Sequence, residues 1–256
     1  MAELVREPVT AEPVPGLGAL RRMAIVPAYN EEGSVGRVIA ELRRFDPGFD
    51  IVVVDDGSHD RTAYVAADCG AHVLRLPFNL GIGGAMQTGF RYAFEHGYDI
   101  AVQCDGDGQH DPTELPKILA PVVAGEADLV VGSRFTGESA FRSTPLRRVG
   151  IRLFAWTVSR LVRQRITDPT SGFRAVGRRG IALFAADYPH DYPEVEATVM
   201  VAKARLRLLE VPAVLRERTT GRSSINAASS VYYMVKVMLA LFVGLFRRSA
   251  TPLEER

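Results

Sequence analysis

The chain has 256 residues, of which 47% are hydrophobic and 24% charged, and its formal net charge is +1. This length and composition are typical of one large folded domain, or of one domain with an appendage. The near-neutral balance excludes a general electrostatic attraction to polyanions, so we expect no nucleic-acid partner.

The first segment, residues 1–21, is acidic and rich in proline. It has no basic start followed by an apolar core, which is the pattern of a secretory signal peptide. We therefore expect a flexible N-terminal lead-in before the folded domain.

Four short apolar runs have the length of strands and end in polar or turn residues: "MAIVPAY", "DIVVVDDGS", "DIAVQCDGDG" and "ADLVVGSRF". Stretches of helical character, residues 31–45, 83–97 and 112–125, separate them. This alternation predicts an α/β fold with a mostly parallel sheet and helices on both faces. Ligands bind beyond the carboxyl ends of such strands. The polar residues at those ends should therefore meet on one rim: Asp55, Asp56, Asp105, Asp107, Ser133 and Arg134.

After residue 140 the chain becomes basic and amphipathic. Residues 144–165 predict a helix, whose apolar face can include Leu146, Val149, Leu153, Trp156 and Val158. Its arginines indicate either a solvated helix docked on the domain or a surface that meets anionic lipid or phosphate. We expect a turn-rich loop over residues 167–180, and an edge strand that runs into an arginine-rich loop within residues 205–224.

The most apolar run, "SSVYYMVKVMLALFVGLFRR", lies near the C-terminus. It falls slightly short of the roughly 20 apolar residues that span a bilayer, and Lys236 interrupts it. Two interpretations stay open. The run forms a hydrophobic helix packed on the domain or on a partner subunit, or it forms a helix lying on a membrane with Arg247 and Arg248 at the headgroups.

The stretch "CDGDGQHDP" alternates oxygen-bearing side chains with glycines. Asp105, Asp107 and Gln109 can point their oxygens the same way, as a hard cation such as Mg²⁺ requires. An EF-hand calcium loop is excluded by spacing, because Pro116 stands where a bidentate glutamate is needed. A purely structural turn would crowd like charges together. The pattern favours a metal site, and His110 lies within it.

Two further clusters deserve a chemical interpretation. Asp55 and Asp56 end a strand and are suited to hydrogen bonds with a ribose or a base edge, whereas Asp60 can simply cap the next helix. "FNLGIGGAMQTG" does not meet the dinucleotide-binding glycine spacing, because Met86 occupies its last position. These glycines instead predict close approach of a helix N-terminus to the substrate or to the sheet.

Taken together, the motifs resemble those of the family 2 glycosyltransferases, which have the Rossmann-like GT-A fold. The resemblance covers roughly residues 22 to 225 and is most similar to the dolichol- or polyprenol-phosphate mannosyl- and glucosyltransferase branch. It implies a GT-A domain over residues 22–225, followed by a C-terminal hydrophobic helix and tail over residues 226–256. The matching motifs are "PAYNEE", "VDDGSHDRT", "NLGIGGA", "CDGDGQHDP", "GSRF" and "DPTSGFR".

The resemblance also implies roles for individual residues. Asp105 and Asp107 would form the metal-binding DxD pair, and Gln109 matches a third ligand on the metal side. The cofactor would be Mg²⁺ or Mn²⁺. The nucleobase and ribose pocket would be lined by Pro27, Tyr29, Glu31 and Asp56.

The same resemblance assigns cations to the phosphates. Arg134 would touch phosphate, and Arg218 with Ser223 resembles a later motif that closes over the diphosphate. A nucleoside diphosphate leaving group gains negative charge in the transition state, which a metal and arginines stabilise. Asp107 and Arg134 are therefore candidate catalytic residues.

Two positions limit the transfer of these roles. Ile82 stands where many dolichol-phosphate enzymes have a lysine. The stretch "YPEVEA" offers Glu194 and Glu196 where inverting members place a catalytic carboxylate. A hydroxyl acceptor needs such a base, whereas an ionised lipid phosphate does not. Of the two, the sequence slightly favours Glu196 as the base, with Glu194 as a helix cap or acceptor ligand.

The sequence thus predicts a metal-dependent inverting glycosyltransferase that moves a sugar from a nucleotide diphosphate to a polyprenyl phosphate. The alternative acceptor is a soluble or secondary-metabolite hydroxyl. The lack of disulfide or metal-knuckle spacing between Cys69 and Cys104 favours the cytoplasm. Peripheral contact with the inner face of the cell membrane and homo-oligomerisation stay open.

Two other classes compete with this interpretation. A sugar nucleotidyltransferase usually opens with a glycine-rich, basic phosphate loop, which "VPAYNEEGS" lacks. A non-catalytic sensor or scaffold would bind a donor without turnover, and no motif is degraded enough to favour it.

Overall fold

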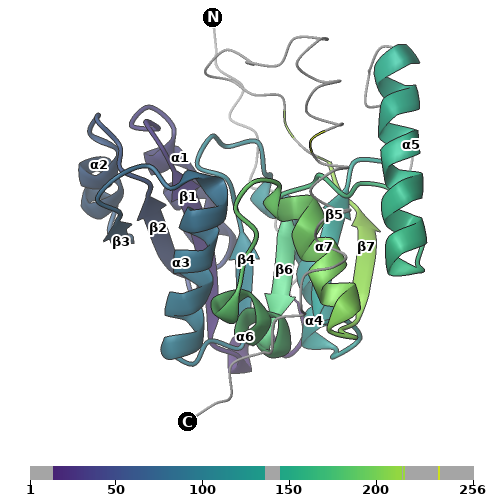
Figure 1. The fold of residues 1–256 in the computed structure, drawn as a ribbon. Helices are drawn as coiled ribbons and strands as arrows, with labels where there is room; N and C mark the ends of the chain where they lie inside the picture. Colours follow the sequence, from purple (N-terminus) through teal and green to yellow (C-terminus); the bar gives the residue numbers. More distant parts are fainter. Residues whose placement is uncertain (1–13, 136–144, 215, 217–235, 237–256) are drawn as a thin grey trace, which may run out of the picture.

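The computed structural model describes residues 14–135, 145–214, 216 and 236. Strands and helices alternate through most of this range (Figure 1). The strands are β1 (Arg22–Ala28), β2 (Asp50–Asp55), β3 (His72–Arg75), β4 (Ile100–Gln103), β5 (Leu129–Ser133), β6 (Arg174–Gly177) and β7 (Leu208–Pro212). The helices are α1 (Val35–Phe45), α2 (Thr62–Asp68), α3 (Gly81–Glu95), α4 (Leu115–Val123), α5 (Pro145–Val162), α6 (Arg178–Ala186) and α7 (Pro193–Lys203), with short 3₁₀ turns η1 (Leu17–Ala19) and η2 (Pro112–Glu114).

The described strands form one sheet in the order β3-β2-β1-β4-β6-β5-β7. All neighbouring pairs are parallel except those of β6, which runs antiparallel to both β4 and β5. Ala28 pairs with Asp55, so β1 and β2 end side by side. The mostly parallel α/β sheet predicted from the alternating runs is confirmed.

Alternation along the strands divides the core into two halves. Met23 and Ile25 of β1 point to the face covered by α3, α5, α6 and α7, whereas Ala24 and Val26 point to the face covered by α1, α2 and α4 (Figure 1). This division follows from the side-chain period of two in a strand. The helices on both faces shield a sheet that is apolar on both sides.

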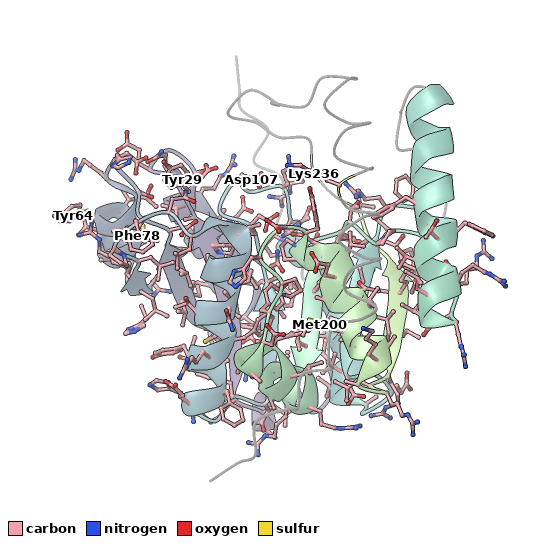
Figure 2. All side chains as sticks on the ribbon, viewed as in Figure 1. Tyr29, Tyr64, Phe78, Asp107, Met200 and Lys236 are labelled. Atoms are coloured by element: carbon pink, nitrogen blue, oxygen red, sulfur yellow. The ribbon has the colours of Figure 1, made fainter. Side chains whose placement is uncertain are left out.

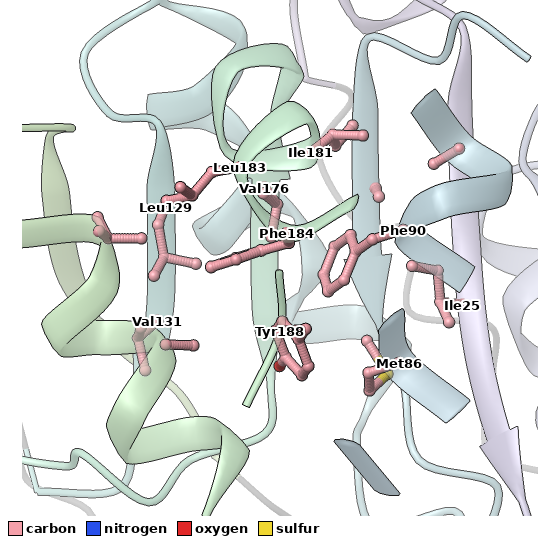
Figure 3. Close-up of a cluster of buried hydrophobic side chains, with 14 of the residues drawn as sticks. Ile25, Met86, Phe90, Leu129, Val131, Val176, Ile181, Leu183, Phe184 and Tyr188 are labelled. Carbon is pink, nitrogen blue, oxygen red and sulfur yellow. The ribbon is translucent and has the colours of Figure 1, made fainter. Parts of the chain in front are cut away.

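Three aromatic rings lie at the centre of the half of the core that α3, α5, α6 and α7 cover (Figure 3). Phe90 of α3 has its ring centroid 5.0 Å from that of Phe184 in α6 and 5.3 Å from that of Tyr188. The tilted and edge-on arrangements at these distances are favourable for aromatic pairs. They fix α3 against α6 and against the loop that leads to α7.

The elements expected from the first four apolar runs are present as β1, β2, β4 and β5, and the intervening helical stretches as α1, α3 and α4. β7 is an edge strand, as expected. The loop predicted over residues 167–180 is wrong in its second half, which forms β6 and the start of α6. β6 has only four residues, and the turn residues just before it hid so short a strand.

The amphipathic helix predicted over residues 144–165 is present as α5, and Trp156 departs from its predicted apolar face. The side chains of Leu146, Val149 and Leu153, also predicted on that face, lie outside those that the structure describes. Phe154 and Val158 are buried, whereas Trp156 is 61% exposed. Successive helical residues are about 100° apart, so Trp156 lies about 200° from both of these neighbours. No helix within the described residues is both long and apolar enough to cross a membrane.

Candidate active site

The carboxyl ends of the parallel strands bring the predicted polar residues to one edge of the sheet. Tyr29 and Asp107, which follow β1 and β4, both lie along the upper edge in Figure 2. The backbone N–H of Gly106 donates to the carbonyl of Pro27 at 3.3 Å, so the chain after β4 stays beside the end of β1. The convergence inferred from strand order is therefore present.

Side chains and backbone groups join the loops after β1 and β2. The backbone N–H of Asn30 donates to Ser58 Oγ at 2.9 Å, and that of Glu31 donates to Thr62 Oγ1 at 2.8 Å. The Glu31 carboxylate accepts a hydrogen bond from Ser34 Oγ at 2.5 Å. Pro27 is buried at the end of β1, and Tyr29 stands exposed beside it. Pro27, Tyr29 and Glu31 are thus held at one corner of the rim.

Asp56 is buried, and its carboxylate binds the N-terminus of α3. Its two oxygens accept from the backbone N–H groups of Leu80 and Gly81 at 2.7 and 2.9 Å. Leu80 is the N-cap residue of α3 and Gly81 is its first residue, so these N–H groups have no intrahelical acceptor. Asp56 therefore fixes α3 to the end of β2. The sequence interpretation had placed the same residue in the nucleotide pocket, which stays a prediction.

The loop after β4 turns its acidic side chains toward the rim and is braced from within. Asp107 Oδ1 accepts from the backbone N–H of Gln109 at 3.0 Å. The backbone N–H of Asp105 donates to His110 Nδ1 at 3.0 Å, and His110 Nε2 lies 3.6 Å from Asp105 Oδ2. The buried His110 ring is thus the brace of this loop, while Asp105, Asp107 and Gln109 stay partly exposed.

Arg134, directly after β5, is held by a fully buried carboxylate. Its Nε and Nη2 donate to the two oxygens of Asp168, each at 2.7 Å, and Nη2 also donates to Thr170 Oγ1. Burial alone would lower the pKa of Arg134, but its hydrogen bonds and charge interaction with Asp168 raise that pKa by more. Arg134 is therefore a fixed cation at the end of β5.

Arg174, the first residue of β6, is a buried cation beneath the rim. Its Nε donates to the carbonyl of Ser171 at 2.8 Å, and Nη2 donates to the carbonyl of Glu194 at 2.6 Å. Within the described residues, its Nη1 has no hydrogen-bond partner. Arg174 thereby joins the loop before β6 to the first turn of α7.

The first turn of α7 carries the two glutamates expected near the reaction. Burial raises the pKa of the Glu194 carboxyl; the charge of Arg174 opposes that increase and the charge of Asp105 adds to it. Glu194 is therefore electrostatically coupled to the rim. Glu196 is also partly buried, but two residues along a helix correspond to about 200°, so it projects from the other side of α7.

The structure thus gathers most of the residues that the sequence singled out, namely Pro27, Tyr29, Glu31, Asp56, Asp105, Asp107, Gln109, Arg134 and Glu194. Arg218, Ser223 and most of the apolar C-terminal run lie outside the described residues. Glu196 lies on the same helix as Glu194 but on its other side.

Several residues at the rim escaped a role in the sequence interpretation. Asp168 and Arg174 are the first and last residues of the motif "DPTSGFR". Glu210 of β7 accepts hydrogen bonds from the backbone N–H groups of Thr167 and Asp168 at 2.7 and 2.9 Å. An acid and an arginine within one turn-rich motif were the available signal for the first two. Nothing in the local sequence marked Glu210, because its partners are 43 and 42 residues away.

Comparison with known proteins gives this geometry a context. The family model described as glycosyl transferase family 2 matches residues 23–185. An undecaprenyl-phosphate mannosyltransferase of Micrococcus luteus is 35% identical in an alignment of 219 positions that covers 81% of this chain and 88% of the relative. A polyprenol monophosphomannose synthase of Mycolicibacterium smegmatis is 32% identical in an alignment of 241 positions that covers 90% of this chain and 89% of the relative.

A solved structure with the same fold is glucosyl-3-phosphoglycerate synthase from Mycobacterium tuberculosis, in complex with Mn²⁺, uridine-diphosphate-glucose and phosphoglyceric acid. It superposes with a TM-score of 0.70 at 19% identity and covers 95% of this chain and 90% of its own. At that identity the likeness concerns the fold alone.

Proposed function

The chain belongs to glycosyl transferase family 2, and on that premise we propose that it transfers a sugar from a nucleotide diphosphate sugar to a polyprenyl phosphate. An oxygen of the acceptor phosphate attacks the anomeric carbon from the side opposite the leaving nucleoside diphosphate. The bond from the anomeric carbon to the diphosphate breaks as the new carbon–oxygen bond forms. A single displacement of this kind inverts the anomeric configuration.

The observation that carries the proposal is the extent of the likeness to two relatives. Both are named for transfer of mannose to a polyprenyl phosphate or polyprenol phosphate, and both are matched over nearly their whole length. The family model matches residues 23–185, which include Asp105, Asp107 and Arg134. An acceptor of the same chemical class is therefore the first choice for this chain.

The residues of the rim fit a divalent cation that is shared with a substrate. No cluster of three or more His, Cys, Asp or Glu side chains able to hold a metal exists among the described residues. Mg²⁺ and Mn²⁺ sites for phosphate substrates need fewer protein ligands, typically one or two carboxylates, because waters and phosphate oxygens supply the rest. We propose that Asp105 and Asp107, with the Gln109 amide, hold Mg²⁺ or Mn²⁺. The ion, when bound, would neutralise charge on the leaving diphosphate.

The other rim residues would contact different parts of the nucleotide diphosphate sugar. We propose that Pro27, Tyr29 and Glu31 line the nucleobase and ribose, next to the Asp56 cap of α3. Arg134, kept in one orientation by Asp168, adds positive charge near the anionic groups. Arg218 and Ser223 are proposed to contact the diphosphate on the strength of the sequence motif alone.

A second candidate acceptor is a hydroxyl group, and Glu194 is the observation that favours it. A hydroxyl must lose its proton as it attacks, so it needs a general base whose pKa lies nearer to the working pH than that of an ordinary carboxyl. Burial raises the pKa of Glu194, and its charge interacts with those of Asp105 and Arg174. If this chain uses a base, we propose Glu194 in preference to Glu196.

The site of action would be the inner face of the cell membrane, which a cytoplasmic enzyme can reach as a peripheral protein. α5 exposes Trp156 and Arg160, an aromatic and a basic side chain of the kinds that favour a lipid interface. The apolar run of residues 229–248 would add to this contact.

The two acceptors are separated by one assay with two lipids. Purified protein receives labelled nucleotide diphosphate sugars with Mn²⁺ and either polyprenyl phosphate or the matching polyprenol. We expect label in the lipid phase with the phosphate only, and Glu194→Gln should keep activity within about tenfold because an ionised phosphate needs no base. Transfer to the polyprenol, abolished by Glu194→Gln, would support the hydroxyl acceptor instead.

A further inference from the structure

The chain that leaves β7 returns to the loop that follows β4, although β5 and β6 lie between these strands in the sheet (Figure 1). The backbone N–H of Val214 donates to Glu114 Oε2 at 3.0 Å. The backbone N–H of Arg216 then donates to the carbonyl of Gln109 at 2.9 Å. A segment from the edge of the sheet is thus hydrogen-bonded to the loop that carries Asp105, Asp107 and Gln109.

The Arg216 side chain strengthens this attachment through two carboxylates. Its Nε and Nη2 lie 3.0 and 2.9 Å from the two oxygens of Asp111, which is the bidentate geometry that a guanidinium favours with a carboxylate. Its Nη1 donates to Glu41 Oε2 of α1 at 2.6 Å. Asp111 Oδ1 in turn accepts from the backbone N–H and the hydroxyl of Thr113 at 3.0 and 2.7 Å. Arg216 therefore connects three parts of the chain that are distant in sequence.

α1 supports the same loop with a second side chain. Gly108 has φ of +78°, and a Cβ at this position would lie 2.6 Å from Arg37 Nη2. Arg37 and Glu41 are four residues apart on α1 and so occupy the same face of the helix. The guanidinium of Arg37 thus packs over Gly108 while Glu41 reaches Arg216, and the outer side of the loop is enclosed by charged groups.

We propose that Arg216 is a positioning residue for the loop of residues 105–111, holding it in the conformation from which Asp105, Asp107 and Gln109 bind the cation and the diphosphate. The effect of Arg216 on cation binding rests on the proposed function. Its effect on the conformation of the loop rests only on its contacts with Gln109, Asp111 and Glu41. Removing the side chain should loosen the loop without removing any of the groups proposed as ligands.

The test compares Arg216→Gln with the matched control Arg207→Gln. Arg207 also pairs with an aspartate, Asp128, but it precedes β7 and therefore lies at the opposite edge of the sheet. Their side chains are 39% and 55% exposed, so both substitutions remove a partly exposed ion pair. Glu41→Gln, which leaves the Arg216–Asp111 pair in place, serves as a milder second variant that removes one arm of the network.

Two measurements are made on each protein. Hydrogen exchange of the backbone amides of residues 105–111, without metal, should be faster in Arg216→Gln, slightly faster in Glu41→Gln and unchanged in Arg207→Gln. Mn²⁺ affinity, measured by electron paramagnetic resonance in the presence of a nucleoside diphosphate, should fall about tenfold in Arg216→Gln, the lower end of the losses seen for outer-shell partners. Arg216→Lys should recover part of the affinity, because lysine keeps the positive charge but cannot make the bidentate contact with Asp111.

The outcomes separate this inference from the proposed function. Exchange and Mn²⁺ affinity that are the same in Arg216→Gln, Glu41→Gln and the wild type would overturn the positioning role and leave the glycosyltransferase proposal standing. A wild type that binds no Mn²⁺, with exchange still faster in Arg216→Gln, would overturn the metal site while supporting the brace. An equal change in Arg207→Gln would show a general loss of stability and contradict a specific role.

Discussion

Arg174 and Glu194 show how the interior of this protein alters the chemistry of single side chains. Arg174 is 2% exposed, yet most of its bonds are to backbone carbonyls rather than to a carboxylate. A buried cation without a directly bonded acid is costly unless negative charges lie nearby. The ionised Glu194 carboxylate is such a charge. Its attraction to Arg174 opposes the increase that burial causes in the pKa of Glu194.

The raised pKa of Glu194 predicts how stability depends on pH. Below the ordinary glutamate pKa, about 4.3, the carboxyl is protonated in both the folded and the unfolded chain. As the pH rises from there through the higher pKa of the folded state, only the unfolded chain loses the proton, so the wild type loses stability. The variant Glu194→Gln lacks this loss.

Urea unfolding at pH 4.5 and pH 7.5, in a buffer with a chelator, measures the effect. The free energy of unfolding of Glu194→Gln minus that of the wild type should be more positive at pH 7.5 than at pH 4.5. The exposed Glu126, changed to Gln, gives the baseline for an ordinary carboxyl. A difference that is equal at the two pH values would mean that the pKa of Glu194 is not raised.

Site residues could be predicted from the sequence where the residues that share a role are close together in the chain. Asp105 and Asp107 stand two residues apart after an apolar run, so their spacing alone indicated a shared role. The partner of Arg134 could not be found in this way, because Asp168 is 34 residues away and reaches it only through the fold. The sequence alone could not decide between Glu194 and Glu196, since it does not show which side of a helix faces the site.

At the scale of elements, α3 depends on glycines for its position. A Cβ on Gly89 would lie 2.4 Å from Ile25 Cγ2 of β1, and a Cβ on Gly83 would lie 2.3 Å from the carbonyl oxygen of Pro189. The helix is therefore in near-backbone contact with the sheet on one side and with the loop before α7 on the other. The sequence predicted that the N-terminus of this helix approaches the substrate or the sheet. The glycine that approaches the sheet is Gly89 in the middle of α3, whereas Gly83 near the N-terminus lies against the loop before α7.

Gly83→Ala tests this packing. The new methyl group would meet backbone atoms of Pro189 and His190, which cannot rotate away as a side chain can. We expect a loss of about 1–3 kcal/mol, the usual range for overpacking, and a fall in Tm of about 2–4 °C per kcal/mol. Gly18→Ala is the control, because nothing lies within 4 Å of a Cβ at that position. An unchanged Tm for Gly83→Ala would contradict the close contact.

The helices α1 and α3 were predictable from the sequence, whereas the strands β3 and β6 were not. α1 and α3 span 11 and 15 residues, long enough for a helical period to be visible in the sequence. β3 (HVLR) and β6 (RAVG) have four residues each, of which only two are apolar, so no apolar run of strand length marks them in the sequence. β6 also runs against the other strands, so the alternation of strands and helices gave no reason to expect it.

At the scale of the whole molecule, one edge of the sheet collects the carboxyl ends of the parallel strands and the amino end of β6. The antiparallel direction of β6 is what brings Arg174 and the preceding loop to the same rim as Asp105 and Arg134. The family 2 glycosyltransferase fold therefore brings basic and acidic groups together from β1, β2, β4, β5, β6 and β7. The fold class and this edge followed from the sequence, whereas the ion pairs that fix the rim required the structure.

The most direct test of the central claim is transfer of a labelled hexose from nucleotide diphosphate sugars into polyprenyl-phosphate-linked product, measured with Mg²⁺ or Mn²⁺ for the wild type, Asp107→Ala and the exposed control Asp68→Ala. We predict labelled lipid from the wild type and from Asp68→Ala, and at least about 100-fold less from Asp107→Ala, a loss typical of removing one group that stabilises transition-state charge. Full activity of Asp107→Ala, or no labelled lipid from the wild type with any donor, would contradict the account.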